Sequence, residues 1–301
     1  MNEATLRLDG RVAIVTGAGG GLGRCHALAL AQRGAKVLVN DVDAGNAERV
    51  AMEIRRGGGE AIGVRASVTD PDAVEAMVGQ AMDAWGRIDI LVNNAGILRD
   101  KSFAKMTLDE FRLVVDVHLI GSAICTKAVW ETMRQQKYGR IVMTTSSSGL
   151  YGNFGQANYG AAKMALVGLM QTLAIEGEKY GIRVNCLAPT AATQMTDGLL
   201  APEALAMLDP ALVSPGVVAL CAETAPTRAI LCAGAGHFSL AYVTMTGGVQ
   251  LGSGADVADQ VTARWDEIGD RAGEFIPASG FAQAEHELAA AGYGAPLMAA
   301  R

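Results

Sequence analysis

One tyrosine and one lysine stand at a spacing that supports acid–base chemistry. Tyr159 and Lys163 are four residues apart in a segment of helical composition, so their side chains share one face of the helix. A free phenol has a pKa of about 10 and exchanges protons slowly at pH 7. One ammonium group at about 4 Å contributes about 4 kcal/mol at an effective dielectric constant of about 20, enough to lower that pKa by about 3 units. We therefore expect Lys163 to lower the pKa of Tyr159, although the pair alone also occurs on ordinary exposed helices.

A third candidate group, Ser146, precedes Tyr159 by thirteen residues and stands at the end of a predicted strand. In parallel sheets covered by helices, ligands bind outside the carboxyl ends of the strands. A serine at a strand end and a Tyr–Lys pair on a helix can converge there. The sequence thus predicts Ser146, Tyr159 and Lys163 as catalytic residues.

The elements that must position these groups alternate regularly. Apolar, β-branched runs recur at intervals of roughly 25 to 50 residues, with helical periodicity between them. We expect strands at residues 12–16, 36–40, 61–65, 88–93, 140–145, 183–188 and 229–232. This alternation predicts an α/β fold, a single-domain, doubly wound, Rossmann-like parallel sheet of about seven strands over residues 1–236. Residues 237–301 have weaker periodicity, and we expect them to form a C-terminal extension packed on the same domain.

A glycine-rich turn follows the first strand directly and opens a helix. In the segment from Thr16 to Gly23, Gly17 permits a tight turn, and Gly21 lets the backbone approach a pyrophosphate. Gly23 allows close packing of helix and strand, and the helix N-terminus at Leu22 offers unpaired N–H groups to phosphates. A merely glycine-rich turn is the alternative, but the order of strand, turn and helix favours dinucleotide binding.

The end of the second strand bears on the choice of dinucleotide. A carboxylate at Asp41 can accept hydrogen bonds from both ribose hydroxyls of the adenosine half and would repel the 2′-phosphate of NADP. We therefore expect NAD as the cofactor. Asp41 and Asp43 could also serve as N-caps of the following helix, and both roles can hold together. Arg24 is the one residue whose positive charge keeps NADP as an alternative cofactor.

Composition excludes several functional classes. The chain has 301 residues with 25 Lys and Arg against 31 Asp and Glu, a net charge of −6, and no local run of like charges, so we expect no nucleic-acid partner. Mean hydropathy is +0.22, but no apolar stretch reaches the length of a membrane span and no export signal is visible, so we expect a cytoplasmic protein without membrane attachment. The five cysteines and four histidines lack disulfide or metal-ligand spacing.

These motifs together identify a family. The chain resembles the short-chain dehydrogenase/reductase family, whose TGxxxGxG, NNAG and YxxxK motifs stand at residues 16–23, 93–96 and 159–163. Residues 92–100, 137–141 and 151–159 are closer still to the (3R)-hydroxyacyl-CoA dehydrogenase unit of peroxisomal multifunctional enzymes type two, also described as 17β-hydroxysteroid dehydrogenase type four. The hydratase and sterol-carrier units of those enzymes have no counterpart here, and we expect a free-standing enzyme.

The resemblance implies that the substrate is a 3-hydroxyacyl-CoA and that it is oxidised by hydride transfer to NAD. An acyl group derived from a sterol side chain is one form of this substrate. Tyr159 would take the hydroxyl proton while Ser146 holds the oxygen, and Lys163 would also bind the nicotinamide ribose. A 17β-hydroxysteroid dehydrogenase and a general carbonyl or 3-oxoacyl reductase are alternatives within the same class. A non-catalytic NAD(H)-binding sensor is the alternative from another class.

The resemblance also implies further cofactor contacts and exposes departures from the family pattern. Ser67 and Val68 stand where many members carry an adenine-contacting Asp, and Asn94 lies in the turn against the cofactor. His118 replaces the family's relay Asn and either relays protons or is a buried, hydrogen-bonded histidine. The carboxamide contact falls on Thr190 or Thr193, of which we take Thr193 as the candidate.

The substrate and subunit contacts are expected outside the motifs. Specificity should come from Leu98, Leu150, Tyr151, Phe154 and residues 194–215, which suit a bulky apolar small-molecule substrate but could equally be core or dimer contacts. Helices expected at 107–138 and 157–180 resemble those that pair between subunits in this family, so we expect a homo-oligomer, at least a dimer.

Overall fold

The computed structural model describes residues 6–192 and 201–295. Eight strands form one sheet in the order β3-β2-β1-β4-β5-β6-β7-β8, and β1 to β7 are parallel. The strands are β1 Val12–Val15, β2 Lys36–Asp41, β3 Ala61–Arg65, β4 Ile90–Asn93, β5 Gly139–Thr144, β6 Ile182–Thr190, β7 Ile230–Gly234 and β8 His237–Ala241. The doubly wound sheet expected from the sequence is confirmed.

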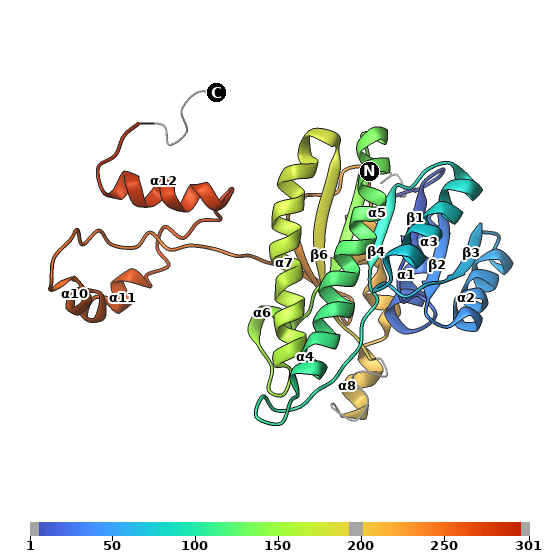
Figure 1. Ribbon diagram of the computed structural model, residues 1–301, viewed down its shortest axis with the longest axis horizontal. Helices are drawn as coiled ribbons and strands as arrows, with labels where there is room; N and C mark the ends of the chain where they lie inside the picture. The colour runs from blue at the N-terminus through green and yellow to red at the C-terminus, as the bar shows by residue number, and fades with distance from the viewer. Residues whose placement is uncertain (1–5, 193–200, 296–301) are drawn as a thin grey trace. The chain divides into compact units, whose positions relative to one another are not determined.

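Helices cover both faces of the sheet. One face carries α1 Gly21–Gln32, α2 Ala44–Arg56 and α9 Ser214–Leu220, and the other carries α3 Pro71–Trp85, α5 Gly121–Gln136 and α7 Ala157–Gly177. In Figure 1, α5 and α7 stand in front of the sheet. The shorter elements are α4 Leu108–Val115, α6 Ser147–Tyr151, the 3-10 turns Glu178–Tyr180 and Pro210–Leu212, and α8 Pro202–Met207.

Buried strand residues alternate between two cores. In β1, Ala13 and Val15 pack under α1 and α2, while Ile14 packs under α3 and α5. Because successive side chains in a strand point to opposite faces, a sheet covered on both sides needs apolar residues at every position. This requirement explains why the strands read as continuous apolar runs in the sequence.

The edge of the sheet differs from the sequence prediction. We expected the sheet to end before residue 237, but His237–Ala241 form β8 and pair antiparallel with β7. The two strands are joined by a two-residue turn in which Ala235 has φ +51° and Gly236 has φ +73°. Such a turn needs positive φ at both positions and usually carries Asn-Gly or Asp-Gly, so Ala-Gly gives a weak sequence signal.

The remaining residues form a second compact unit, from Tyr242 onwards. It contains α10 Val257–Ala263, α11 Trp265–Ile268 and α12 Gly280–Ala290. A bridge between Met245 and Phe275 and a hydrogen bond between His286 Nε2 and the Gly247 carbonyl oxygen hold it together. None of its described residues, 242–295, is buried.

Residues Leu108–Gln136 form one continuous helical run of 29 residues. The run is long enough to cross a membrane, and its most apolar 18-residue window has a mean hydropathy of 1.5, with 39% of that window buried. It packs on α3, β4 and β5, as the core helix of a globular fold does. Length and composition therefore do not by themselves indicate a membrane helix here.

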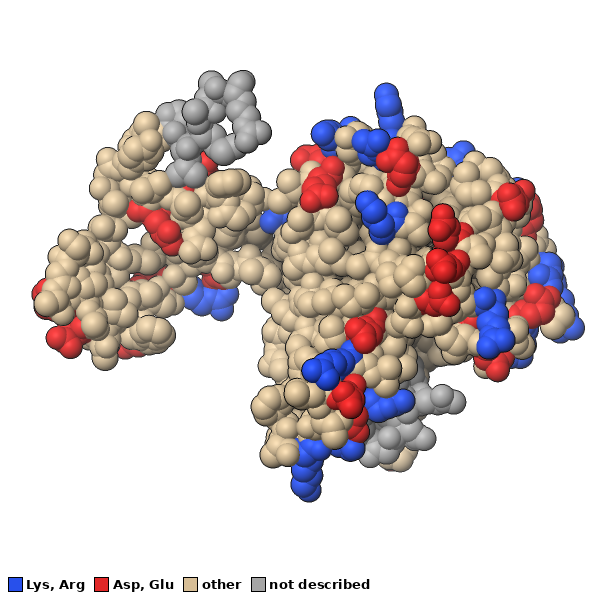
Figure 2. Space-filling view, in the orientation of Figure 1, with Lys and Arg blue, Asp and Glu red and all other residues tan. Residues whose placement is uncertain are grey.

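Charged side chains are dispersed on the visible surface of the sheet-containing unit. In Figure 2, Lys and Arg are interspersed with Asp and Glu over this face. This face therefore offers no continuous basic area of the kind that binds nucleic acid.

Candidate active site

The glycine turn lies at the point where the strand order reverses, between β1 and β4. Gly17 has φ +60°, and a Cβ there would come within 2.7 Å of Ala95 Cα, just beyond β4. A Cβ at Gly23 would lie 2.4 Å from the Gly17 carbonyl oxygen. Dinucleotides bind across the crevice at such a switch point, and only glycine fits these two positions.

The helix that follows the turn has an open N-terminus. Gly20 is the N-cap of α1 and supplies no side-chain hydrogen bond, so the N–H groups of Gly21, Leu22 and Gly23 are left for a ligand. The α1 dipole adds partial positive charge at this end. This backbone cradle fits the pyrophosphate of a dinucleotide.

Asn94 holds the turn in place. Its Nδ2 donates to the carbonyl oxygens of Thr16 and Gly17 at 2.9 and 3.1 Å, and its backbone N–H donates to Thr16 Oγ1 at 3.0 Å. The neighbouring Asn93 donates through Nδ2 to Thr126 Oγ1 at 3.0 Å. Asn94 therefore joins the loop after β4 to the phosphate turn after β1.

Asp41 stands beside the turn at the end of β2. Its Oδ2 accepts a hydrogen bond from Gly19 N at 3.0 Å, and its Oδ1 accepts one from Asp43 N at 3.0 Å. The N-cap of α2 is Asp43, whose Oδ1 accepts from Asn46 N at 2.8 Å. The capping role proposed as an alternative for Asp41 thus falls to Asp43, and Asp41 remains at the edge of the dinucleotide crevice.

Two arginines lie near this corner. Arg24 pairs with Glu53 on α2 through two hydrogen bonds, so its charge is matched by a carboxylate. Arg49, which the sequence analysis did not single out, donates from Nη2 to the Gly19 carbonyl oxygen at 2.6 Å. The spacing of residues in the sequence does not indicate this contact, because Arg49 reaches the turn only when α2 takes its place in the folded protein.

The expected adenine contacts lie at the end of β3, two strands from the crevice. Ser67 is half-buried and its Oγ is 2.8 Å from Thr69 Oγ1. Val68 is buried against Gly121, where a Cβ would lie 2.7 Å from Val68 Cγ2. Both residues are at the carboxyl edge of the sheet, and their contact with adenine stays a prediction.

The three predicted catalytic side chains meet at the carboxyl ends of β5 and β6. Ser146 is the N-cap of α6, and its Oγ accepts a hydrogen bond from Ser148 N at 3.2 Å. This leaves the Ser146 hydroxyl hydrogen for Tyr159, and that hydrogen bond lowers the pKa of Tyr159. Lys163 Nζ lies 5.5 Å from the centre of the Tyr159 ring and donates to the Thr144 carbonyl oxygen.

The balance of effects on Tyr159 corrects one expectation. Burial outweighs the Ser146 hydrogen bond, and the pKa of Tyr159 is raised above its ordinary value, with a further increase from the charge of Asp100. The expected lowering by Lys163 is not present in this arrangement. Burial also lowers the pKa of Lys163 to about 7, which weakens its charge at neutral pH, and its ammonium group points to the Thr144 carbonyl.

His118 packs beside the tyrosine from a rare helical geometry. It lies in a π-helical turn, Asp116–Ile120, within the long α4–α5 run, and such turns often occur at functional sites. Its Nε2 is 2.8 Å from the Ile97 carbonyl oxygen and 3.1 Å from Ile97 N. Burial, with the charge of Lys163, lowers the pKa of His118 to about 3, so the ring is neutral at pH 7. The buried, hydrogen-bonded alternative therefore describes its geometry.

The remaining sequence candidates divide between the rim of the site and the interior. Tyr151 and Phe154 are 72% and 90% exposed, which excludes a core role in this chain, whereas Leu98 and Leu150 are half-buried. Phe103, not singled out from the sequence, is 74% exposed on the same loop as Leu98. Thr190 ends β6 at the same edge of the sheet, and Thr193 lies outside the described residues, as does part of 194–215.

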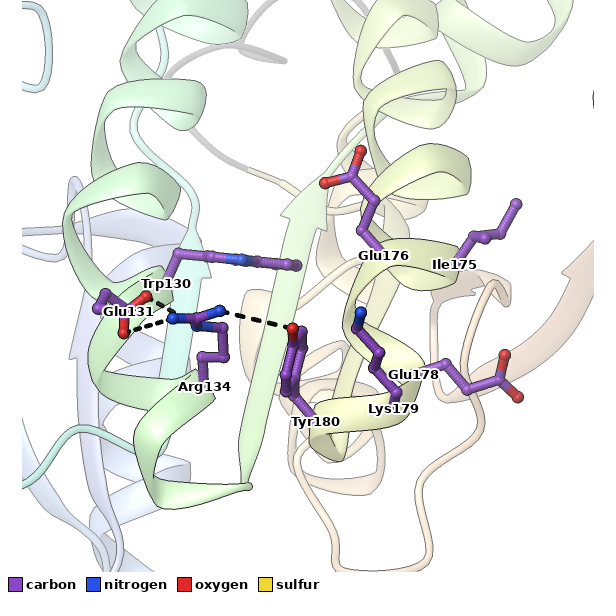
Figure 3. A pocket seen from close by; sticks show the side chains of 8 residues that line it. All are labelled: Trp130, Glu131, Arg134, Ile175, Glu176, Glu178, Lys179 and Tyr180. Carbon is purple, nitrogen blue, oxygen red and sulfur yellow. Dashed lines mark hydrogen bonds and ion pairs between the residues drawn. The ribbon is translucent and has the colours of Figure 1, made fainter. Parts of the chain in front are cut away.

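One hollow lies away from this site. It measures about 700 Å³ and lies between the C-terminal ends of α5 and α7, which precede the amino ends of β5 and β6. Figure 3 shows Arg134 between Glu131 and Tyr180 inside it. Arg134, Glu131 and Tyr180 are thus hydrogen-bonded to one another at the end of the sheet away from Tyr159.

Within residues 6–192 and 201–295, no group of three or more His, Cys, Asp or Glu side chains could hold a metal ion. The five cysteines are free thiols, and Cys125, Cys186 and Cys221 are buried. The carboxyl edge of the sheet presents a dinucleotide cradle and a Ser–Tyr–Lys group.

A fold and site of this kind define a nicotinamide-dependent oxidoreductase. The short chain dehydrogenase family model matches residues 11–203, and the chain belongs to this family. It is 50% identical over 228 residues to peroxisomal multifunctional enzyme type 2 of Mus musculus, covering 73% of this chain and 31% of that protein. The chain thus spans about a third of the length of this relative.

Solved structures agree with this assignment. The full-length peroxisomal multifunctional enzyme type 2 of Drosophila melanogaster aligns with a TM-score of 0.80 and 40% identity, covering 94% of this chain and 49% of that one. A 7α-hydroxysteroid dehydrogenase solved with NADH and 7-oxo glycochenodeoxycholic acid aligns with a TM-score of 0.73 and 31% identity, covering 78% of this chain and 97% of that one. The chain is an oxidoreductase of the short-chain dehydrogenase type.

Proposed function

We propose that this oxidoreductase transfers hydride between NAD and a secondary alcohol, and that the alcohol is a 3-hydroxyacyl-CoA thioester oxidised to the 3-oxo compound. The observation that carries the proposal is the meeting of Ser146, Tyr159 and Lys163 at the sheet edge that also holds the Gly17–Gly23 cradle. The peroxisomal relative is named as a multifunctional enzyme, and this chain matches 31% of its length.

In the proposed reaction each catalytic side chain has one task. Ser146 donates a hydrogen bond to the substrate oxygen and holds it beside the phenol of Tyr159. Tyr159 removes the hydroxyl proton as general base, and in the reverse direction it returns that proton to the ketone. Lys163 would hydrogen-bond the nicotinamide ribose. When bound between the Gly17–Gly23 cradle and Lys163, NAD would supply the hydride acceptor for the carbinol carbon and a positive charge that favours the phenolate.

We infer NAD rather than NADP from the corner around Asp41. A 2′-phosphate would approach the Asp41 carboxylate, which already accepts from Gly19 N and Asp43 N. Arg24, the residue that left NADP open, is paired with Glu53 and is not free to neutralise a phosphate. The related dehydrogenase solved with NADH supports the same choice.

The exposed aromatic rim supports a bulky apolar substrate. Tyr151, Phe154 and Phe103 present large, exposed side chains on the segments that follow β4 and β5, the second of which also carries Ser146. An acyl chain or a steroid would both fit this chemistry. A hydroxysteroid is therefore the second candidate substrate, favoured by the relative whose structure holds a bile-acid ketone.

One assay distinguishes these candidates. Purified protein is incubated with (3R)- and (3S)-3-hydroxyacyl-CoA thioesters of several chain lengths and with 17β- and 7α-hydroxysteroids, with NAD and NADP in parallel, and NADH or NADPH absorbance is followed. We expect thioester oxidation with NAD. Steroid oxidation without thioester oxidation would select the second candidate, and equal rates with NADP would remove the role given to Asp41.

We also propose that the chain forms at least a homodimer through α5 and α7. Ile120, Met164 and Ile175 are apolar side chains of this helical layer that are between 40% and 46% exposed. Light scattering coupled to size exclusion should give a mass of at least two chains. Replacing both Met164 and Ile175 by Lys should shift the protein toward the monomer, and an unchanged dimer would place the interface elsewhere.

A further inference from the structure

The residue before Tyr159 has a side chain that is fully used. Asn158 is 0% exposed, and its Nδ2 donates to the Arg99 carbonyl oxygen at 3.1 Å. Its Oδ1 accepts from the backbone N–H of Tyr159 at 2.7 Å. One buried amide thus connects the backbone of the tyrosine to the loop that follows β4. Burying an amide is costly unless both ends are hydrogen-bonded, and here both are.

The start of α7 explains why this amide is needed. The first N–H groups of a helix lack partners within the helix and are usually satisfied by an N-cap side chain. The N-cap of α7 is Gln156, which makes no such bond. Its Nε2 instead donates to Asp100 Oδ2 at 2.6 Å, and its Oε1 accepts from Asn153 Nδ2 at 3.1 Å. Asn158 therefore does for the N–H of Tyr159 what an N-cap would ordinarily do.

Three hydrogen bonds tie the loop at residues 99–101 to the start of α7. Besides the bonds from Asn158 and Gln156, Lys101 N donates to the Gly155 carbonyl oxygen at 2.9 Å. The same loop carries Asp100, whose charge acts on Tyr159. The backbone position of the tyrosine and the position of the loop are thus fixed by the same contacts.

We propose that Asn158 is a positioning residue for the reaction: it fixes the first turn of α7 against residues 99–101, so that the phenol of Tyr159 stays aligned with Ser146. The inference rests on the proposed function only through the role of Tyr159 as acid–base group. It assigns Asn158 no contact with substrate or cofactor. Because misplacement of a reacting group by about 1 Å can reduce a rate about 100-fold, a small tilt of this turn would be measurable.

The groups that face the Tyr159 side chain come from four segments. Ser146 follows β5, Lys163 is on α7, His118 is on the π-helical turn, and Asp100 is on the loop. His118 is neutral throughout the working pH range because its pKa is about 3. If altering Asn158 changes the pH dependence of turnover, the change therefore does not come from His118. It reports on the surroundings of Tyr159, which include Lys163 and Asp100.

The test compares Asn158→Ala and Asn158→Asp with Asn153→Ala in the full chain. Asn158→Ala removes both bonds, while Asn158→Asp keeps the acceptor for Tyr159 N and loses the donor to Arg99. Asn153→Ala removes an exposed amide of the loop between α6 and α7, whose hydrogen bond goes to Gln156 Oε1 and not to the Tyr159 backbone. We expect Asn158→Ala to lower kcat by about 10- to 100-fold, with KM and the NADH dissociation constant within about twofold. Its pH profile should move to higher pH, because Ser146 then stabilises the phenolate less well.

Asn158→Asp should fall between Asn158→Ala and wild type in kcat, and it decides the matter if Asn158→Ala does not fold. A folded Asn158 variant with the kcat and pH profile of Asn153→Ala would overturn the proposal. Tyr159→Phe is measured in the same series. If that variant retains wild-type turnover, the acid–base role of Tyr159 is wrong; if it is inactive while the Asn158 variants match the control, only the positioning role is wrong.

Discussion

The ring of His118 stands edge-on to the ring of Tyr159, with 5.2 Å between the ring centres and 86° between the planes. The same histidine is hydrogen-bonded to Ile97, so it joins the phenol to the loop after β4. Gly96 makes this packing possible, because a Cβ there would lie 2.3 Å from His118 Cε1. The neutral imidazole thus acts as a wall of the site.

Tyr159→Phe should abolish turnover and leave NADH binding nearly unchanged. The substitution removes the hydroxyl that exchanges the proton and keeps the ring that packs against His118. Loss of a general acid–base group typically costs about 10²- to 10⁴-fold in rate. Steady-state kinetics and a fluorescence titration with NADH check the two halves, and a variant with full activity would contradict the assignment.

Asp41→Ser should reduce the preference for NAD over NADP by roughly tenfold or more, equivalent to about 1.4 kcal/mol. The change removes a carboxylate that would repel the 2′-phosphate, and Arg49 lies beside Gly19 and can then attract it. The measurement is the ratio of kcat/KM for the two cofactors. Arg49→Ala in the same background serves as control and should remove most of the gain with NADP.

Gly23→Ala should weaken NADH binding at least tenfold and lower the melting temperature. The added methyl group would meet the Gly17 carbonyl oxygen at 2.4 Å and Asn94 Nδ2 at 2.5 Å, and overpacking of this kind costs about 1–3 kcal/mol. Gly20→Ala is the matched control, since Gly20 has φ −169° and a Cβ there meets nothing within 4 Å. Equal effects of both substitutions would refute the close-packing account.

The protein should lose stability as the pH falls from about 6.5 toward 3. Burial lowers the pKa of both His26 and His118 to about 3, against 6.5 in the unfolded chain. The unfolded state therefore binds more protons in this window, and each histidine could remove up to about 4 kcal/mol of stability by pH 3. The stability that comes from keeping His26 and His118 neutral is fully present only above about pH 6.5.

Urea unfolding at pH 7, 5.5 and 4.5 tests this pH dependence. His26→Asn removes one of the two titrating groups while an amide can still reach Ser214 Oγ, which lies 2.9 Å from His26 Nδ1 in the native chain. The variant should be less stable than wild type at pH 7 but lose less stability on acidification. Parallel losses in the two proteins would show that His26 does not contribute.

Much of the fold could be predicted because it depends on local patterns. Seven strands follow from apolar runs, since a parallel sheet buried on both faces needs continuous apolar strands, and helical periodicity between the runs indicates the crossover helices. The edge strand β8 was missed because its turn, Ala235–Gly236, lacks the usual residues for positive φ. A hairpin of that kind is recognised only when both strands are seen to pair.

The chemical groups of the site can be recognised in the chain, because Gly17 to Gly23, Ser146, Tyr159 and Lys163 show their types and spacing there. Their environment depends on the folded arrangement. It paired Arg24 with Glu53, brought Arg49 to the glycine turn, and buried Tyr159 so that its pKa rises although Lys163 is near. Desolvation and ion pairing depend on which segments come together in space, and such long-range contacts leave no local signal in the sequence.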